Sequence, residues 1–145
     1  MVWQKRRMYA ANSITAIEIF KIKYMASKKT LVLGASLNPA RYSFLAVNKL
    51  LAHNHEVIAI GKRTGTIQNV TIATETTDAK DIDTVTLYLN PTNQVPYYNY
   101  LLSLKPRRII FNPGSENSEL EEMAAKEGIK VQEACTLVLL STNQY

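Results

Sequence analysis

Cysteine and long hydrophobic runs are both scarce in this 145-residue sequence. Its single cysteine, Cys135, excludes an internal disulfide framework and fits a reducing compartment, so we expect a cytoplasmic protein. No apolar run approaches the roughly 18 residues that a membrane-spanning helix needs. The first residues also lack the apolar core and small-residue cleavage site of a secretory signal. We therefore expect no membrane partner.

Histidine is equally scarce, with only His53 and His55 in the chain. Two histidines without a nearby cysteine or aspartate make a poor metal site, so we expect a surface or helix-end role for them and no metal. The net charge of +5 is concentrated at one end, because residues 1–24 carry five Lys or Arg and one Glu. The remaining residues are nearly neutral, which gives no electrostatic reason to expect nucleic acid as a partner.

Residues 1–27 differ in composition from the rest and are interpreted as an N-terminal extension of a single domain at residues 28–145. Three interpretations of the extension remain open: a basic amphipathic anchor, a presequence, or a non-native upstream stretch before a start at Met25. The first rests on apolar residues that would share one helical face, namely Ile14, Ile17, Phe20 and Tyr24. The third is favoured because residues 25–29 resemble an ordinary N-terminus that runs directly into a strand.

After residue 28 the sequence predicts strands that alternate with helices. Short apolar runs bounded by Gly, Pro or Asn predict strands at Thr30–Leu33, Glu56–Ile60, Asp83–Leu89, Arg108–Phe111 and Ile129–Gln132, with a weaker one near Val70–Ile72. Helical spacing predicts helices at Ala40–His53, Thr92–Leu104 and Ser115–Glu127, followed by a final apolar stretch at Thr136–Leu140. This alternation predicts an α/β fold, a single three-layer Rossmann-like domain with a parallel sheet of about five strands.

Ligands of such sheets bind outside the carboxyl ends of the strands, where the strand order reverses. Four loops begin where predicted strands end: Gly34–Arg41, Gly61–Gly65, Leu89–Thr92 and Asn112–Asn117. The first resembles a phosphate-binding turn, in which a helix start and small residues present backbone N–H groups. Asn38 is predicted to cap that helix and Pro39 to open it. The candidate ligand-binding residues of this loop are Gly34, Ala35, Ser36, Asn38, Arg41 and Ser43.

The second loop distinguishes between nucleotide ligands. An NAD site has an acidic residue near the end of the second strand, whereas here Gly61 is followed by Lys62 and Arg63. Two cations suit a phosphorylated ribose, as in the 3′-phosphate of coenzyme A or the 2′-phosphate of NADP. A plain turn at the first loop and two solvated cations at the second are the alternatives that involve no ligand.

In these loops the chain resembles the small CoA-binding proteins, whose fold is that of the CoA-binding domain at the start of the succinyl-CoA synthetase α-subunit. The resemblance covers residues 28–142 and is carried by Thr30–Ser43, His55–Gly65, Asn112–Asn117 and Glu133–Leu140. It implies that the first loop contacts the pyrophosphate and that Lys62 and Arg63 meet the ribose phosphate. It also implies that further walls of the cleft are formed by Leu89, Asn90, Pro91, Asn112, Pro113 and Gly114.

The chain departs from the synthetase domain in lacking some glycines of its first loop, and it has no second domain to supply that enzyme's phosphorylated histidine. We therefore expect a module that binds coenzyme A or an acyl-CoA without catalytic residues. Two alternatives remain: an NADP-binding oxidoreductase subunit, and a degenerate Rossmann domain that acts as a regulatory or oligomerisation module. A homodimer or an unknown protein partner is compatible with each. Cys135 is expected to be a buried structural thiol.

Overall fold

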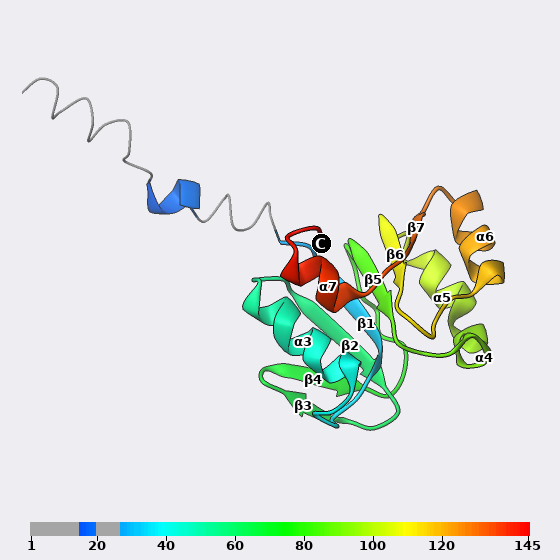
Figure 1. The fold of residues 1–145 in the computed structure, drawn as a ribbon, viewed down its shortest axis with the longest axis horizontal. Helices are drawn as coiled ribbons and strands as arrows, with labels where there is room; N and C mark the ends of the chain where they lie inside the picture. Colours follow the sequence, from blue (N-terminus) through cyan, green and yellow to red (C-terminus); the bar gives the residue numbers. More distant parts are fainter. Residues whose placement is uncertain (1–14, 20–26) are drawn as a thin grey trace, which may run out of the picture.

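The computed structural model describes residues 15–19 and 27–145 of the chain (Figure 1). Most of the predicted N-terminal extension, including Ile14, Phe20 and Tyr24, lies outside the described residues. Ile17 is exposed within a short helical stretch at residues 16–19. In the described part of the chain, no helix combines the length and the apolar character needed to cross a membrane.

A seven-stranded sheet forms the centre of the domain, in the order β3-β4-β2-β1-β5-β6-β7. The five main predicted strands are all present, as β1 (Thr30–Ala35), β2 (Val57–Gly61), β5 (Thr84–Leu87), β6 (Arg108–Phe111) and β7 (Lys130–Glu133). These five pair in parallel, and every residue of β5 and β6 is buried. Burial of both faces explains the apolar runs of β1 and β6, whereas the edge strand β7 is not buried.

The sheet is larger than the predicted five strands because residues 65–73 form a hairpin. Strand β3 (Gly65–Ile67) pairs antiparallel with β4 (Val70–Ala73), and β4 adds in parallel to β2. Ile67, Val70 and Ile72 are buried, whereas Thr66 and Thr71 are exposed. Such alternation in very short strands of a threonine-rich segment is a weak signal, which is why the sequence indicated only one short strand here.

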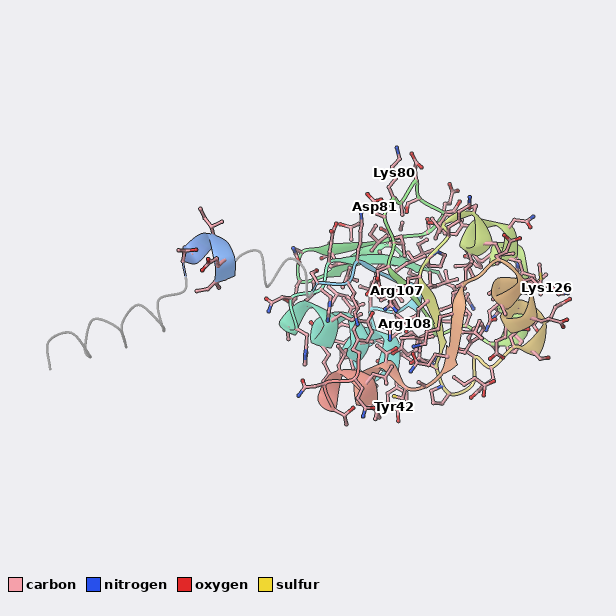
Figure 2. All side chains as sticks on the ribbon, turned by 90° about the horizontal axis from the view of Figure 1, so that it is seen from above. Tyr42, Lys80, Asp81, Arg107, Arg108 and Lys126 are labelled. Carbon is pink, nitrogen blue, oxygen red and sulfur yellow. The ribbon has the colours of Figure 1, made fainter. Side chains whose placement is uncertain are left out.

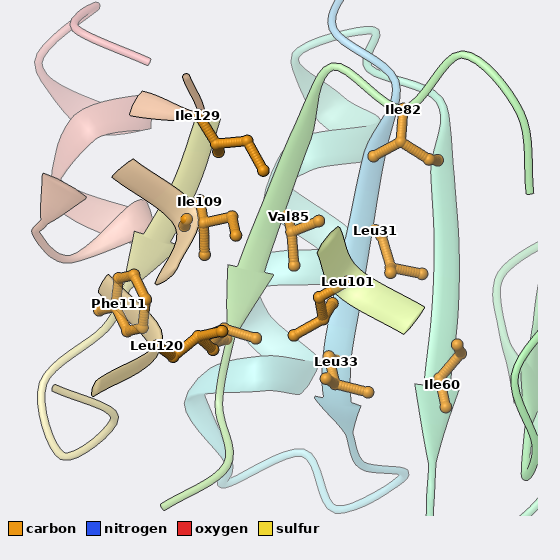
Figure 3. Packing of buried hydrophobic residues seen from close by; sticks show 12 residues of the cluster. Leu31, Leu33, Ile60, Ile82, Val85, Leu101, Ile109, Phe111, Leu120 and Ile129 are labelled. Atoms are coloured by element: carbon orange, nitrogen blue, oxygen red, sulfur yellow. The ribbon is translucent and has the colours of Figure 1, made fainter. Parts of the chain in front are cut away.

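Helices cover both faces of the sheet, as expected for three layers (Figure 1). On one face, α3 (Tyr42–Ala52) and α7 (Thr136–Ser141) pack Val47, Leu50 and Leu140 against the strands. On the other face, α5 (Tyr98–Ser103) and α6 (Ser118–Lys126) contribute Leu101 and Leu120. Figure 3 shows this second cluster, in which those leucines meet side chains from β1, β5 and β6.

Two predicted helix starts are wrong and one predicted helix is interrupted, each for a local reason. Helix α3 begins after Arg41, because Asn38 makes a turn instead of capping the helix. The predicted helix at Thr92–Leu104 is divided into α4 (Pro91–Gln94), a 3₁₀ turn (Val95–Tyr97) and α5, since Pro96 supplies no N–H inside a helix. Helix α6 begins three residues later than predicted because Asn117 caps it, accepting a hydrogen bond from Leu120 N at 3.2 Å.

Candidate functional site

A cavity of about 1000 Å³ lies at the carboxyl ends of β1 and β2 and beside the segment that follows β5. Strand β1 lies between β2 on one side and β5 on the other, so the chain order reverses at this point of the sheet. A reversal of strand order leaves a crevice that helices do not cover. The predicted site residues that line the cavity are Gly34, Ala35, Ser36, Asn38, Arg41, Ser43, Gly61, Lys62, Arg63, Leu89, Asn90 and Pro113.

Two glycines allow the strand ends to approach one another beneath the cavity. A Cβ atom on Gly61 would lie 2.2 Å from the carbonyl oxygen of Ala35. Gly34 has φ +97°, and a Cβ there would lie 3.0 Å from the backbone carbon of Tyr88. Both glycines are required by contact between neighbouring chain segments, which places the loops side by side.

The phosphate-loop candidate is shaped by its own side chains. The hydroxyl of Ser36 accepts a hydrogen bond from Asn38 N at 3.1 Å, and Asn38 Oδ1 accepts one from Ala40 N at 3.0 Å. Arg41 N donates to the carbonyl of Asn38 at 3.0 Å, which completes the turn. The predicted helix cap at Asn38 is thus corrected to a turn-forming role, and Arg41 becomes the residue before α3.

The N-terminus of α3 points its positive end at this loop. Arg41 has extended backbone geometry and makes no side-chain capping bond, and the first turn of α3 contains no acidic residue. By contrast, α4 is capped by the side chain of Asn90 and α6 by that of Asn117. Uncapped N–H groups and the helix dipole favour an anion at the start of α3.

Three cations border the cavity. Arg41 precedes α3, while Lys62 and Arg63 form the exposed turn between β2 and β3. None of the three forms an ion pair with a carboxylate in the part of the chain that the structure describes. Charges without a protein partner remain available for an anionic ligand, and they come from two different loops that line the same cavity.

The segment after β5 forms a further wall. Asn90 lines the cavity and also caps α4, accepting from Asn93 N at 3.0 Å. Gln94 is fully buried behind this wall and its side-chain amide donates to the carbonyls of Leu89 and Ser115, each at 2.8 Å. Gln94 therefore fixes this wall from the protein interior, although it was not among the site residues predicted from the sequence.

Three predicted site residues, Pro91, Asn112 and Gly114, do not line the cavity. Pro91 is the first residue of α4. Asn112 is buried: its amide donates to Thr86 Oγ1 at 2.7 Å and to Leu87 O at 2.9 Å, and its Oδ1 accepts from Thr136 N at 2.8 Å. Asn112 thereby joins β6 to β5 and to the start of α7. Cys135 is half-buried at that helix start, and not fully buried as expected.

The cavity also contains residues that sequence reasoning missed. They include three tyrosines, of which Tyr42 is exposed and Tyr88 and Tyr97 are partly buried. Burial raises the pKa of Tyr88, whose hydroxyl finds no hydrogen-bond partner among the described residues. Leu37, Ala40, Thr74 and Asn93 are the other additions beyond the strand ends. Tyr88 and Asn93 flank the predicted loop Leu89–Thr92, so a slightly wider loop would have included them.

Comparison with known proteins gives one family. A family model described as a CoA binding domain matches residues 28–141. A solved structure described only as an uncharacterized protein is 50% identical, with a TM-score of 0.81, and covers 83% of this chain and 99% of its own. A hypothetical protein from Pyrococcus horikoshii OT3 is 20% identical, with a TM-score of 0.73 and coverages of 90% and 92%.

A protein from Thermus thermophilus also shares the fold, at 18% identity and a TM-score of 0.73, covering 90% of this chain and all of its own. At these low identities the last two structures support the fold alone. A search of curated proteins finds no match.

Proposed function

The chain belongs to the CoA-binding domain family, and we propose on this basis that its cavity binds coenzyme A or an acyl-CoA. The observation that carries the proposal is the group of three cations, Arg41, Lys62 and Arg63, which border one cavity without a described carboxylate partner. Coenzyme A has two separate anionic groups, a pyrophosphate and a ribose 3′-phosphate. Cations on two separate loops of the cavity match that distribution of charge.

The pyrophosphate is assigned to the loop Gly34–Arg41 and the N-terminus of α3. Backbone N–H groups and the helix dipole favour phosphate there, and Arg41 adds a formal charge. Ser43 is buried in the first turn of α3 and lines the same part of the cavity. Pyrophosphate is common to many nucleotides, so this part of the cavity is proposed to contribute affinity and little selectivity.

Selectivity is assigned to Lys62 and Arg63 at the end of β2. No acidic residue stands there to hold an unmodified ribose, which disfavours NAD. The same cations would tolerate the 2′-phosphate of NADP, so NADP is the competing ligand that an experiment must include. We assign binding residues and no catalytic residue, and the protein is proposed to hold its ligand as a module.

Calorimetric titration with CoA, dephospho-CoA and NADP tests this assignment. Dephospho-CoA lacks only the 3′-phosphate, so CoA is expected to bind about 10-fold or more tightly than dephospho-CoA. In the variant Lys62→Ala/Arg63→Ala the two ligands should bind equally, whereas Arg41→Ala should weaken both. Equal affinities in the unaltered protein would refute the roles of Lys62 and Arg63. Tighter binding of NADP than of CoA would favour the alternative ligand.

Lys80 provides the matched control for these charge deletions. It is an exposed lysine in the segment between β4 and β5 and does not line the cavity. Figure 2 shows Lys80 and the cavity residue Tyr42 on opposite sides of the molecule. Lys80→Ala changes the net charge by one unit and should leave all affinities unchanged at moderate salt, because exposed charges beyond about 10 Å are screened.

A further inference from the structure

The turn that carries Lys62 and Arg63 is held by the sheet at its β2 end, where Gly61 pairs with Ala35, but only weakly at its β3 end. It connects β2 to β3, and β3 contains three residues at the edge of the sheet, where β4 is its one neighbour. A three-residue edge strand supplies few hydrogen bonds, so it opens easily. The position of the two cations relative to the phosphate loop therefore needs another contact to hold it.

Leu37 supplies such a contact from the phosphate loop itself. A Cβ atom built on Gly65, the first residue of β3, would lie 2.5 Å from Leu37 Cδ1 and 2.8 Å from Cδ2. The isobutyl group of Leu37 thus rests directly on the backbone of Gly65, in space that any other residue at position 65 would occupy. Leu37 remains 40% exposed and lines the cavity, so its contact with Gly65 is not simply part of the packing of the hydrophobic core.

We propose that Leu37 is a positioning residue, which braces the turn at Lys62 and Arg63 against the phosphate loop and so sets the preference for a ligand with a ribose phosphate. This proposal rests on the proposed function and extends it to a residue without charge. The contact joins the two anion-binding parts of the cavity through a single apolar side chain. Charge-assisted hydrogen bonds depend steeply on geometry, so a looser turn loses selectivity even though both cations are still present.

Three variants test the brace. Leu37→Ala removes the contact with Gly65, and Leu37→Met keeps an apolar side chain of similar volume. Leu45→Ala is the matched control, because Leu45 is 42% exposed on α3 and does not line the cavity. For each variant, calorimetry measures the ratio of CoA to dephospho-CoA affinity. Hydrogen–deuterium exchange of the ligand-free protein follows the peptide that spans residues 61–67.

Leu37→Ala is expected to lower the affinity ratio by about three- to tenfold while dephospho-CoA binding changes little. Exchange in residues 62–65 should become several-fold faster, and Leu37→Met and Leu45→Ala should behave like the unaltered protein. A side chain that merely contacts the ligand would weaken both ligands equally and leave the ratio intact, which would overturn the proposal. Unchanged exchange would overturn it as well.

These outcomes separate the brace from the proposed function. If the unaltered protein fails to prefer CoA over dephospho-CoA, the assignment of Lys62 and Arg63 fails, and with it the effect of Leu37 on selectivity. If the preference is present and Leu37→Ala retains it, the assignment of the cations stands and the role of Leu37 alone is refuted.

Discussion

Replacing Gln94 by alanine should lower the free energy of unfolding by about 3–5 kcal/mol. Gln94 is fully buried, and its amide nitrogen donates to the carbonyls of Leu89 and Ser115. Its Oε1 accepts from Asn117 Nδ2 at 2.8 Å. Alanine leaves the Ser115 carbonyl and the Asn117 amide buried without Gln94, and the Leu89 carbonyl half-buried, at about 1–3 kcal/mol each with the last at the low end. Because the groups belong to one network, the total is smaller than the sum of the largest values.

Equilibrium unfolding in urea measures this loss. The matched control is Asn93→Ala, which removes an exposed amide at the adjacent position and should change stability by less than about 0.5 kcal/mol. Gln94→Glu preserves shape but turns a carboxylate toward two carbonyl oxygens, so it should be more destabilising at neutral pH than in acid. Leu89 lines the cavity, so Gln94→Ala should also weaken CoA binding.

The result that would refute this reasoning is a loss below about 1 kcal/mol for Gln94→Ala with cooperative unfolding retained. Such a value would mean that water replaces the side chain without cost. The carbonyl of Ser115 would then be accessible to solvent, in conflict with the burial of its hydrogen bond to Gln94.

Two further predictions concern Gly61 in β2 and His55 in the segment before β2. Gly61→Ala should lower the free energy of unfolding by more than about 2 kcal/mol, because the new Cβ would lie 2.2 Å from Ala35 O; an unchanged thermal midpoint would contradict this. The second is a pH dependence at His55, whose Nδ1 accepts from Lys28 N at 2.9 Å; burial, and then the charge of Lys28, lower the pKa of His55 from its ordinary 6.5. The folded protein therefore favours the neutral imidazole, and this contribution to the free energy of unfolding is complete above pH 6.5 and is lost as the pH falls through the lower pKa of the folded state. The urea midpoint should consequently drop between pH 7 and 5, and it should drop less in His55→Gln. Parallel pH profiles of the two proteins would argue against it.

The location of the cavity could be predicted because its main residues follow buried strands directly. Gly34 and Gly61 end apolar runs, and Leu89 follows one. In a parallel sheet the carboxyl ends of all strands share one edge, so residues at those ends must gather there. The strand pattern is therefore enough to predict that the first two loops lie together.

Other features could not be predicted because they depend on partners distant in the chain. Asn112 follows a strand like the true cavity residues, yet its side chain bonds to Thr86 and Thr136 and is buried. Nothing in the local sequence distinguishes an asparagine that faces a ligand from one that joins two strands. Likewise, the local sequence around Leu37 indicates only an ordinary loop residue, because its contact with Gly65 forms only in the folded chain.

The amino-acid sequence by itself determined the α/β architecture, the edge of the sheet where the cavity lies, and the three cations that border it. These follow from local periodicity and from residue types at strand ends. Tertiary structure alone decided which polar groups face the cavity and which form hydrogen bonds in the protein interior. Asn112 shows why: it is buried just after β6, its amide donates to Thr86 Oγ1 and Leu87 O, and its Oδ1 accepts from Thr136 N. Burial requires a polar side chain to find a partner, and only the folded chain brings such partners together.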